Sequence, residues 1–282
     1  MYIKDSTGVF RSKSGHVTHR EEHYPESGFD DLLEMQNRHF WYMGRYKFIF
    51  SALRDIAPSY SFSCIDLGGG VGGWIKYLRE NLQTNKDAEI ALADSSNVAL
   101  IKAINVIGPT IERYQVDLMD LKWRDRWDIV FLLDVIEHIP NDVRALQEVA
   151  RALKPDGKII LTVPALDFFW SHNDEAAKHL RRYSKKDLQE LADKAGLRLV
   201  NSSYFMFFLS PLYWLSRIRV GKNASIEEKK EAIQREHKIP FGALNFILGV
   251  IFKAETPISK IISFPWGTSV LGVFEKVAPQ LE

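Results

Sequence analysis

Three features that would each point to a class of protein are scarce or missing. Cys64 is the only cysteine among 282 residues, so no disulfide can form within the chain and we expect a reducing compartment. The 37 basic and 36 acidic side chains leave a net charge of +1, and no dense basic block with interleaved aromatic residues occurs. A nucleic-acid partner is therefore disfavoured, because such partners select strongly basic surfaces.

Long apolar runs are also missing. Residues 1–6 do not contain the apolar core of a secretory signal, so we expect a cytoplasmic location. Two apolar stretches, 204–215 and 241–252, are both shorter than the ~20 residues that span a bilayer. We expect a helical insertion here. It could act as a hydrophobic lid, as a peripheral membrane contact through 204–252, as a homodimer contact, or simply as helices folded back on the core.

A glycine-rich turn is the most informative feature that the sequence does contain. Residues 62–65 predict a short buried strand, and residues 74–78 have the apolar spacing of a helix packed on a sheet. Between them runs Asp66-Leu67-Gly68-Gly69-Gly70-Val71-Gly72-Gly73. Gly68, Gly70 and Gly73 satisfy G-x-G-x-x-G, the pattern in which a pyrophosphate rests on a helix N-terminus.

The carboxylate of Asp66 distinguishes between two ligands for this turn. A buried acid would repel a pyrophosphate at close range, whereas it would attract the ammonium and sulfonium groups of S-adenosylmethionine. The turn therefore favours the methyl donor. A nicotinamide dinucleotide remains the alternative.

Three further acids follow predicted strands, at the edge where open parallel sheets place their ligands. Asp94 can accept both ribose hydroxyls, and its neighbour Ser95 is included among the predicted cofactor-binding residues. Asp117 can accept from an adenine amino group while Leu118 covers the ring. Asp134 ends the apolar run 127–133 and opens a polar cluster. Four acids in register favour one shared binding site.

These residues resemble the class I S-adenosylmethionine-dependent methyltransferases over roughly 40–199, with a last strand near 268–277. The resemblance implies an α/β fold with a doubly wound, mostly parallel seven-stranded sheet and S-adenosyl-L-methionine as cofactor. It assigns Asp66, Gly68, Gly70 and Gly72 to the cofactor loop, Asp94 to the ribose, Asp117 and Leu118 to adenine, and Asp134 to the fourth-strand acid. The stretch Trp-Ser-x-x-Asp followed by His-x-Arg-Arg-Tyr, within 170–183, is similar to methyltransferases of polysaccharide, glycolipid and lipid-linked glycan pathways.

The chain divides into five expected segments: a mobile tail over 1–28, cap helices over 29–58, the cofactor-binding core over 59–203, the helical insertion over 204–266, and the last strand with the C-terminus over 267–282. In the cap, Arg45 is a candidate partner for the methionine carboxylate. In the tail, His16, His19 and His23 share a helical spacing, but no carboxylate or cysteine completes a ligand set, so we predict no metal there.

Three histidines are candidates for a general base, because an imidazole can accept a hydroxyl proton near neutral pH. His138, four residues after Asp134, is the first choice, and His172 and His179 are its rivals. Glu137-His138 also resembles a pair that gathers a divalent metal in quinone-pathway methyltransferases, although our prediction includes no metal. Arg181 and Arg182 could clamp an acidic group or pair within their own loop.

The sequence therefore predicts a methyltransferase that acts on a hydroxyl or carboxyl oxygen. Its acceptor would be a glycan-like, lipid-linked or other small molecule. Two alternatives stay open: a nicotinamide-dependent oxidoreductase, and a non-catalytic subunit that binds S-adenosylmethionine.

Overall fold

The structure, a computed structural model, describes residues 2–13, 17, 28–58, 61–82, 88–218 and 238–277. Its centre is a sheet of nine strands in the order β1-β2-β5-β4-β3-β6-β7-β9-β8. The strands are β1 (Tyr2–Lys4), β2 (Val9–Ser12), β3 (Ser63–Leu67), β4 (Glu89–Asp94), β5 (Glu112–Gln115), β6 (Trp127–Leu133), β7 (Leu153–Pro164), β8 (Leu197–Phe205) and β9 (Ser269–Lys276). From β2 to β7 every neighbouring pair is parallel, whereas β9 runs antiparallel to both β7 and β8.

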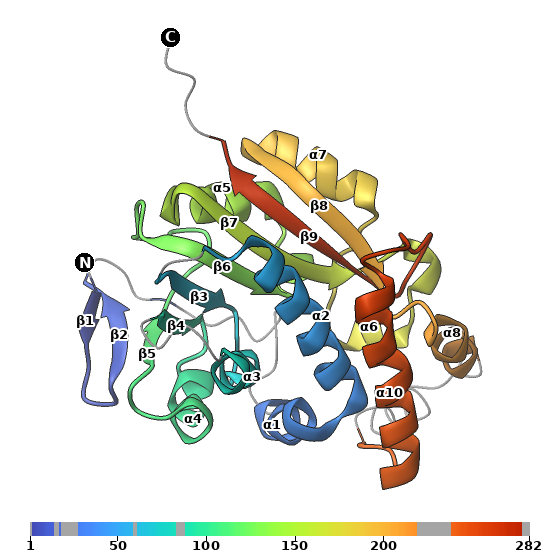
Figure 1. The fold of residues 1–282 in the computed structure, drawn as a ribbon. Helices are drawn as coiled ribbons and strands as arrows, with labels where there is room; N and C mark the ends of the chain where they lie inside the picture. Colours follow the sequence, from blue (N-terminus) through green and yellow to red (C-terminus); the bar gives the residue numbers. More distant parts are fainter. Residues whose placement is uncertain are drawn as a thin grey trace.

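Helices cover both faces of this sheet (Figure 1). They are α1 (Phe29–Arg38), α2 (Phe40–Ile56), α3 (Gly73–Asn81), α4 (Asn97–Ile107), α5 (Asp142–Ala152), α6 (His172–Ala176), α7 (Lys185–Ala195), α8 (Ser210–Ile218) and α10 (Gly242–Ile258), with short 3-10 turns at Ile136–His138 and Asp167–Phe169. Helices α5 and α7 pack into one apolar layer, and α2, α3, α4 and α10 pack into the other. The doubly wound α/β fold predicted from the sequence is confirmed.

The sheet has two strands more than the seven predicted. Strands β1 and β2 form a hairpin whose second strand pairs in parallel with β5, so residues 2–12 are not the mobile tail that we expected. Aromatic contacts hold this hairpin in place: the ring of Tyr2 lies 4.8 Å from that of Trp123, and the ring of Phe10 lies 4.9 Å from that of Tyr114. His16, His19 and His23 lie outside the described residues.

The region of the predicted insertion contains α8 and α10, and its first apolar stretch begins later than expected because Tyr204 and Phe205 complete β8. Helix α10 lies directly against α2. A side-chain carbon added at Gly44 of α2 would come within 2.3 Å of the Phe252 ring of α10, so the glycine permits this close approach. None of the described helices is both long and apolar enough to cross a membrane.

Candidate active site

A cavity of about 1230 Å³ opens at the carboxyl ends of the parallel strands. One end is lined by the glycine turn after β3 and by acids that follow β4, β5 and β6; the other end is lined by residues of α8 and α10. Pockets for one small ligand measure roughly 300–1,000 Å³. This cavity therefore has room for two ligands, a nucleoside-like donor and an acceptor.

The shape of the glycine turn depends on backbone conformations that favour glycine and on hydrogen bonds to Asp94. Gly68, Gly70 and Gly72 have φ angles of 76°, 56° and 84°, in the left-handed region that favours glycine. The amide nitrogen of Gly70 donates to Oδ2 of Asp94 over 2.9 Å, and Ser96 donates its amide to Oδ1 over 2.8 Å. The predicted ribose acid therefore also fixes the shape of the turn.

Asp66 supplies the negative charge expected beside the turn. Its side chain is buried in β3, lines the cavity, and has an oxygen, Oδ1, with no hydrogen-bond partner among the described residues. Burial raises the pKa of Asp66 to about 7; the nearby Arg45 lowers it and Asp94 raises it further. A buried carboxyl with an unsatisfied oxygen fits a cationic ligand group such as the ammonium of S-adenosylmethionine.

Arg45, the predicted partner of the methionine carboxylate, lines the same cavity from α2. Its Nη2 lies 3.0 Å from Oδ2 of Asp134 and donates to Oγ1 of Thr162 over 3.0 Å, and its guanidinium lies over the Trp41 ring. Asp134 itself adopts a left-handed φ of 58°. The structure thus joins a cap helix to the fourth-strand acid, and the contact with a methionine carboxylate stays a prediction.

The residues predicted to contact the nucleoside line the cavity beside the turn. Asp117 is exposed and accepts the Met119 amide over 2.8 Å, while Leu118 is half-buried. The carbonyl of Ser95 accepts from Gln115 over 2.9 Å. These positions are compatible with the predicted adenine site between Leu118 and the turn, whose contacts stay a prediction.

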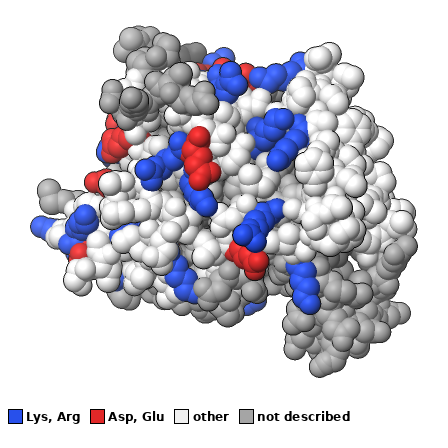
Figure 2. Space-filling view, turned by 60° about the horizontal axis from the view of Figure 1, so that its bottom comes forward, with Lys and Arg blue, Asp and Glu red and all other residues white. Residues whose placement is uncertain are grey.

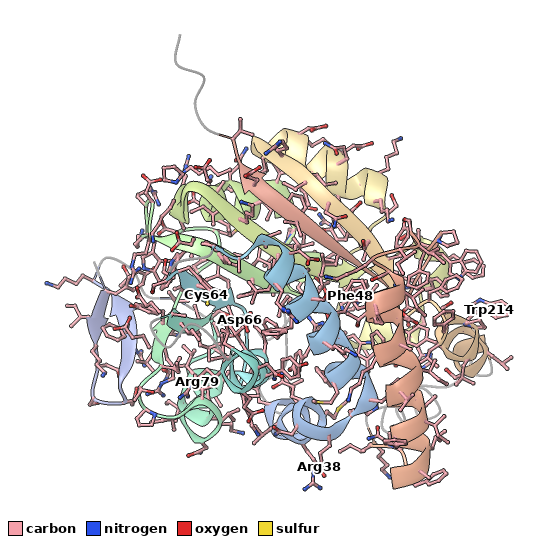
Figure 3. All side chains as sticks on the ribbon, viewed as in Figure 1. Arg38, Phe48, Cys64, Asp66, Arg79 and Trp214 are labelled. Atoms are coloured by element: carbon pink, nitrogen blue, oxygen red, sulfur yellow. The ribbon has the colours of Figure 1, made fainter. Side chains whose placement is uncertain are left out.

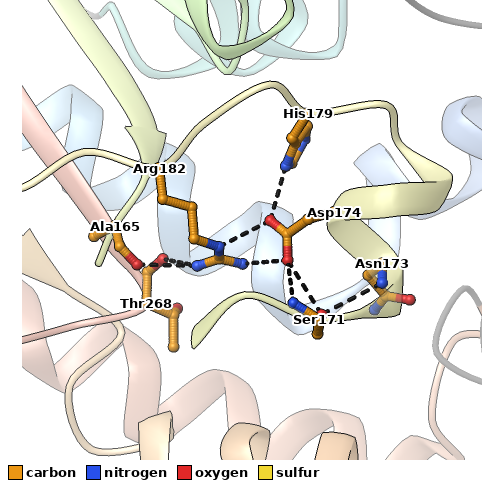
Figure 4. Close-up of polar contacts among 7 residues, drawn as sticks. All are labelled: Ala165, Ser171, Asn173, Asp174, His179, Arg182 and Thr268. Carbon is orange, nitrogen blue, oxygen red and sulfur yellow. Dashed lines mark hydrogen bonds and ion pairs between the residues drawn. The ribbon is translucent and has the colours of Figure 1, made fainter. Parts of the chain in front are cut away.

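The loop after β7 contains a buried carboxylate that organises its neighbours (Figure 4). Oδ1 of Asp174 lies 2.9 Å from Nδ1 of His179, and Arg182 donates to both oxygens of the same carboxylate, over 2.8 and 2.9 Å. Ser171 adds its amide, over 2.8 Å. Burial alone would raise the pKa of Asp174, but the hydrogen bonds and charges of His179 and Arg182 hold it well below its usual range.

Two of the three candidate bases meet in the cavity. The rings of His138 and His179 lie 4.9 Å apart at nearly a right angle, and both line the cavity. His172, at the start of α6, is buried and is not among the described residues that line it. The geometry therefore favours His179 or His138 as the base.

The two arginines of this loop are engaged in contacts within the fold. Arg182 donates to Asp174 and to the carbonyl oxygens of Ala165 and Thr268. Arg181 pairs with Asp142 over 2.8 Å. Both arginines therefore stabilise the loop rather than offering an open clamp for a phosphate, the other role that we considered.

Glu137, His138 and His179 form a compact group, whose potential ligand atoms lie within 4.8 Å of one another. Glu137 is completely buried, and its burial together with the charge of Asp134 raises its pKa well above the usual range. This group could hold a divalent cation. The presence of this group neither confirms nor contradicts our prediction that the protein binds no metal.

Comparison with known proteins identifies the family. A model of the family described as a methyltransferase domain matches residues 36–202, which is more than half of the chain. The chain belongs to this methyltransferase family. The membership predicted from the glycine turn and the strand-end acids, in the class I S-adenosylmethionine-dependent methyltransferases, is confirmed. Membership in this family argues against the alternative of a nicotinamide-dependent oxidoreductase.

Individual relatives are distant. Phosphoethanolamine N-methyltransferase 2 of Caenorhabditis elegans is 25% identical over 152 residues, which cover 52% of this chain and 34% of the relative, so the chain spans about a third of that protein's length. The structure of a Haemonchus contortus phosphoethanolamine N-methyltransferase 2 with S-adenosyl-L-methionine has a TM-score of 0.51 and 18% identity, covering 89% of this chain and 60% of its own.

A second similar structure is that of a Haloferax volcanii methyltransferase, described as putative, in complex with the activator Trm112. Its TM-score is 0.59 and its identity 19%, over 93% of this chain and 99% of that one. At these identities the solved structures support the fold alone.

Asp174 was not among the predicted site residues. Its signal was present, since Ser171 and Asp174 have the spacing of a capping box and the structure contains that box. An acid that caps a helix can at the same time orient a histidine from the following turn. The cavity residues Tyr213 and Leu248 were assigned only to the insertion, because their place in the cavity depends on how α8 and α10 pack.

Proposed function

We propose that the chain uses S-adenosyl-L-methionine to methylate a hydroxyl group of a glycan-like or lipid-linked acceptor in the cytoplasm, with His179 as the general base. The observation that carries this proposal is the pair formed by Asp174 and His179, which lies in the cavity that also contains the glycine turn. Methyl transfer mainly requires alignment of its reactants, and a base is needed where the acceptor must lose a proton.

The donor end of the cavity provides the groups that such a cofactor needs. Asp66 matches an ammonium, Asp94 and Ser95 a ribose, and Asp117 and Leu118 an adenine ring. When bound there, S-adenosyl-L-methionine supplies a methyl group carried on a cationic sulfur. Since Gly68 and Gly70 line the same space and carry no side chain, the turn allows the ligand a close approach to the backbone.

Asp174 determines which ring nitrogen of His179 carries the proton. A carboxylate within hydrogen-bond distance of Nδ1 favours the tautomer with its proton on Nδ1, so that Nε2 can accept a proton. We assign Nε2 as the atom that takes the acceptor's hydroxyl proton, and Asp174 then stabilises the imidazolium. The sequence prediction had ranked His138 first as the base; here His179 takes that role. His138, beside it, would orient the acceptor oxygen.

A direct experiment tests this function in two steps. Mass spectrometry of the purified full chain should detect copurified S-adenosylhomocysteine. Incubation with radiolabelled S-adenosyl-L-methionine and a total membrane lipid extract should then label the lipid fraction. Binding of S-adenosylhomocysteine without any transfer would instead support the non-catalytic subunit, and labelling of added phosphoethanolamine alone would move the proposal to an amine acceptor.

A further inference from the structure

The strongest unexplained feature outside the donor site is a broad apolar surface. We define the apolar face by six side chains of α8, α10 and the segments beside α10: Leu212, Trp214, Phe241, Phe246, Ile247 and Ile261. Phe241, Phe246 and Ile261 have 71%, 70% and 87% of their surface exposed. Monomeric proteins seldom leave so many large apolar side chains exposed in one region, so this face is expected to be covered by a partner.

The apolar face lies on one side of the molecule. Trp214 projects from α8 at the right-hand edge of Figure 3, far from the central Asp66. In Figure 2 the right-hand side of the surface carries few charged residues, whereas lysines, arginines and acids are interspersed over the rest of that view. Phe168 extends the face from the loop after β7, since its ring stacks on Trp214 at 5.8 Å.

In the segments that form the apolar face, the exposed charged side chains are basic. Across residues 206–218 and 238–268 the only acidic side chain is Glu255, and it is buried. The basic residues of the same segments include Lys238 and Lys253. Within these two segments, exposed apolar side chains are bordered by cations and no acid is exposed. This matches the surface of an anionic bilayer, where tryptophan and phenylalanine enter the interface and lysines meet the head groups.

The cavity reaches the surface at this same face. Leu212 is 54% exposed and also lines the cavity, together with Tyr213 and Ser216 of α8 and Leu248 of α10. The exposed Lys238 lines it as well. A protein partner or a second copy seated on the apolar face would cover this opening. A bilayer would instead present its own molecules to it.

We propose that the apolar face docks on an anionic lipid bilayer and turns the cavity opening toward it, so that the methyl acceptor is an amphipathic molecule that enters from the membrane. The docking is inferred from the apolar face alone. The statement about the acceptor rests on the proposed methyl transfer. Neither α8 nor α10 spans the bilayer, since no described helix is long and apolar enough.

Vesicle flotation with the full chain tests this docking. We expect the protein to float with vesicles of phosphatidylcholine mixed with phosphatidylglycerol, less with phosphatidylcholine alone, and less as NaCl rises to several hundred millimolar. Replacing Trp214, Phe246 and Ile247 together with serine should weaken binding about tenfold or more. A matched control replaces three apolar residues of similar exposure elsewhere, Ile3, Ile101 and Val200, with serine and should bind as the parent does.

Two measurements keep the result decisive. Calorimetry with S-adenosylhomocysteine and a melting curve show that each variant is folded, and Phe246→Ser alone replaces the triple variant if the latter melts early. A folded parent that does not float, or a triple variant that floats as the control does, overturns the docking. A dimer that light scattering detects and that the triple variant dissolves also overturns it, in favour of a second copy. Loss of S-adenosylhomocysteine binding by the parent would overturn the proposed function and leave the vesicle result valid.

Discussion

Nδ1 of His179 lies 2.9 Å from Oδ1 of Asp174, and the same carboxylate is held on its other side by Arg182. Asp174 is only 1% exposed, so its position is fixed by these contacts and by the amide of Ser171 rather than by water. A histidine oriented in this way presents a defined ring nitrogen to its surroundings.

The first prediction concerns these two histidines. His179→Ala should lower turnover about 100 to 10,000-fold, the usual contribution of a general base, and leave the affinity for S-adenosylhomocysteine unchanged. His138→Ala is the matched comparison and should lower turnover less. Steady-state rates and calorimetry on both variants check this. A larger loss in His138→Ala would return the base to our first choice from the sequence, and undiminished rates in both would indicate an acceptor that needs no base.

The second prediction follows from the raised pKa of Asp66, about 7 because of its burial. Below that pH the carboxyl is protonated in the free protein and cannot attract an ammonium. Affinity for S-adenosylhomocysteine should therefore rise as the pH increases toward 7, by about tenfold per unit, and level off above it. In Asp66→Asn the rise should vanish. Calorimetry between pH 5 and 8 gives the profile, and an affinity in the parent that is flat with pH would separate Asp66 from the ligand's ammonium.

The raised pKa of Asp66 affects the folding stability of the ligand-free protein in the opposite direction from ligand affinity. Because the folded pKa of Asp66 lies above its unfolded value, the folded state binds more protons between the two values, and this group's contribution to stability falls as the pH rises through that interval. Ligand binding and folding stability should therefore respond to pH in opposite directions. That contrast separates an effect at Asp66 from a general loss of structure.

The third prediction concerns Asp94, which holds the amides of Gly70 and Ser96. Asp94→Ala should weaken S-adenosylhomocysteine binding by roughly 2 to 4 kcal/mol, because charge-assisted hydrogen bonds are each worth about 1.5 to 3 kcal/mol. Asp94→Asn keeps the size of the side chain and one acceptor oxygen, so it should lose less. Unchanged affinity in Asp94→Ala would remove this residue from the ribose site.

The sequence revealed the donor end of the cavity because its signals are local. Asp66, Gly68 and Gly70 lie within five residues, and a strand, a turn and a helix fix their geometry in any protein that contains this pattern. Asp94 and Asp134 could be placed as well, because parallel strands bring their carboxyl ends to one edge of the sheet.

The parts that the sequence did not reveal depend on contacts between distant segments. The β1–β2 hairpin is held by the packing of Tyr2 and Phe10 on Tyr114 and Trp123, more than 100 residues away, and short polar segments give no periodic signal of such packing. The role of Arg182 was equally hidden, since a charged residue in a loop looks the same whether it meets a ligand or a buried acid.

The fourth prediction compares two glycines with different surroundings. The nearest neighbours of a side-chain carbon at Gly70 would be Leu32 and Phe29, at an ordinary 3.6 Å, and all three residues line the cavity. Gly70→Val should therefore abolish S-adenosylhomocysteine binding, with a moderate cost in stability from its positive φ. Gly44→Ala should instead lower the melting temperature, because its added carbon meets the Phe252 ring at 2.3 Å. A Gly70→Val variant that binds normally would contradict the placement of the ligand.

The last prediction concerns Glu255, whose buried side chain joins α10 to the start of α8. Its Oε1 accepts the Phe208 amide over 2.8 Å, next to Met206 with its left-handed φ of 59°. Burial raises the pKa of this carboxyl, and the backbone amides of residues 206–208 lower it in part.

Glu255→Ala removes the acceptor of the Phe208 amide and leaves a cavity where a buried side chain was, so we expect a loss of about 2 to 4 kcal/mol from the free energy of unfolding. Glu255→Gln retains an acceptor oxygen and should cost less. Chemical denaturation of both variants measures the difference. Since α8 and α10 both carry side chains of the apolar face, Glu255→Ala should also weaken vesicle binding more than Glu255→Gln does. Equal stability of both variants and the parent would mean that the start of α8 is held by its aromatic contacts alone.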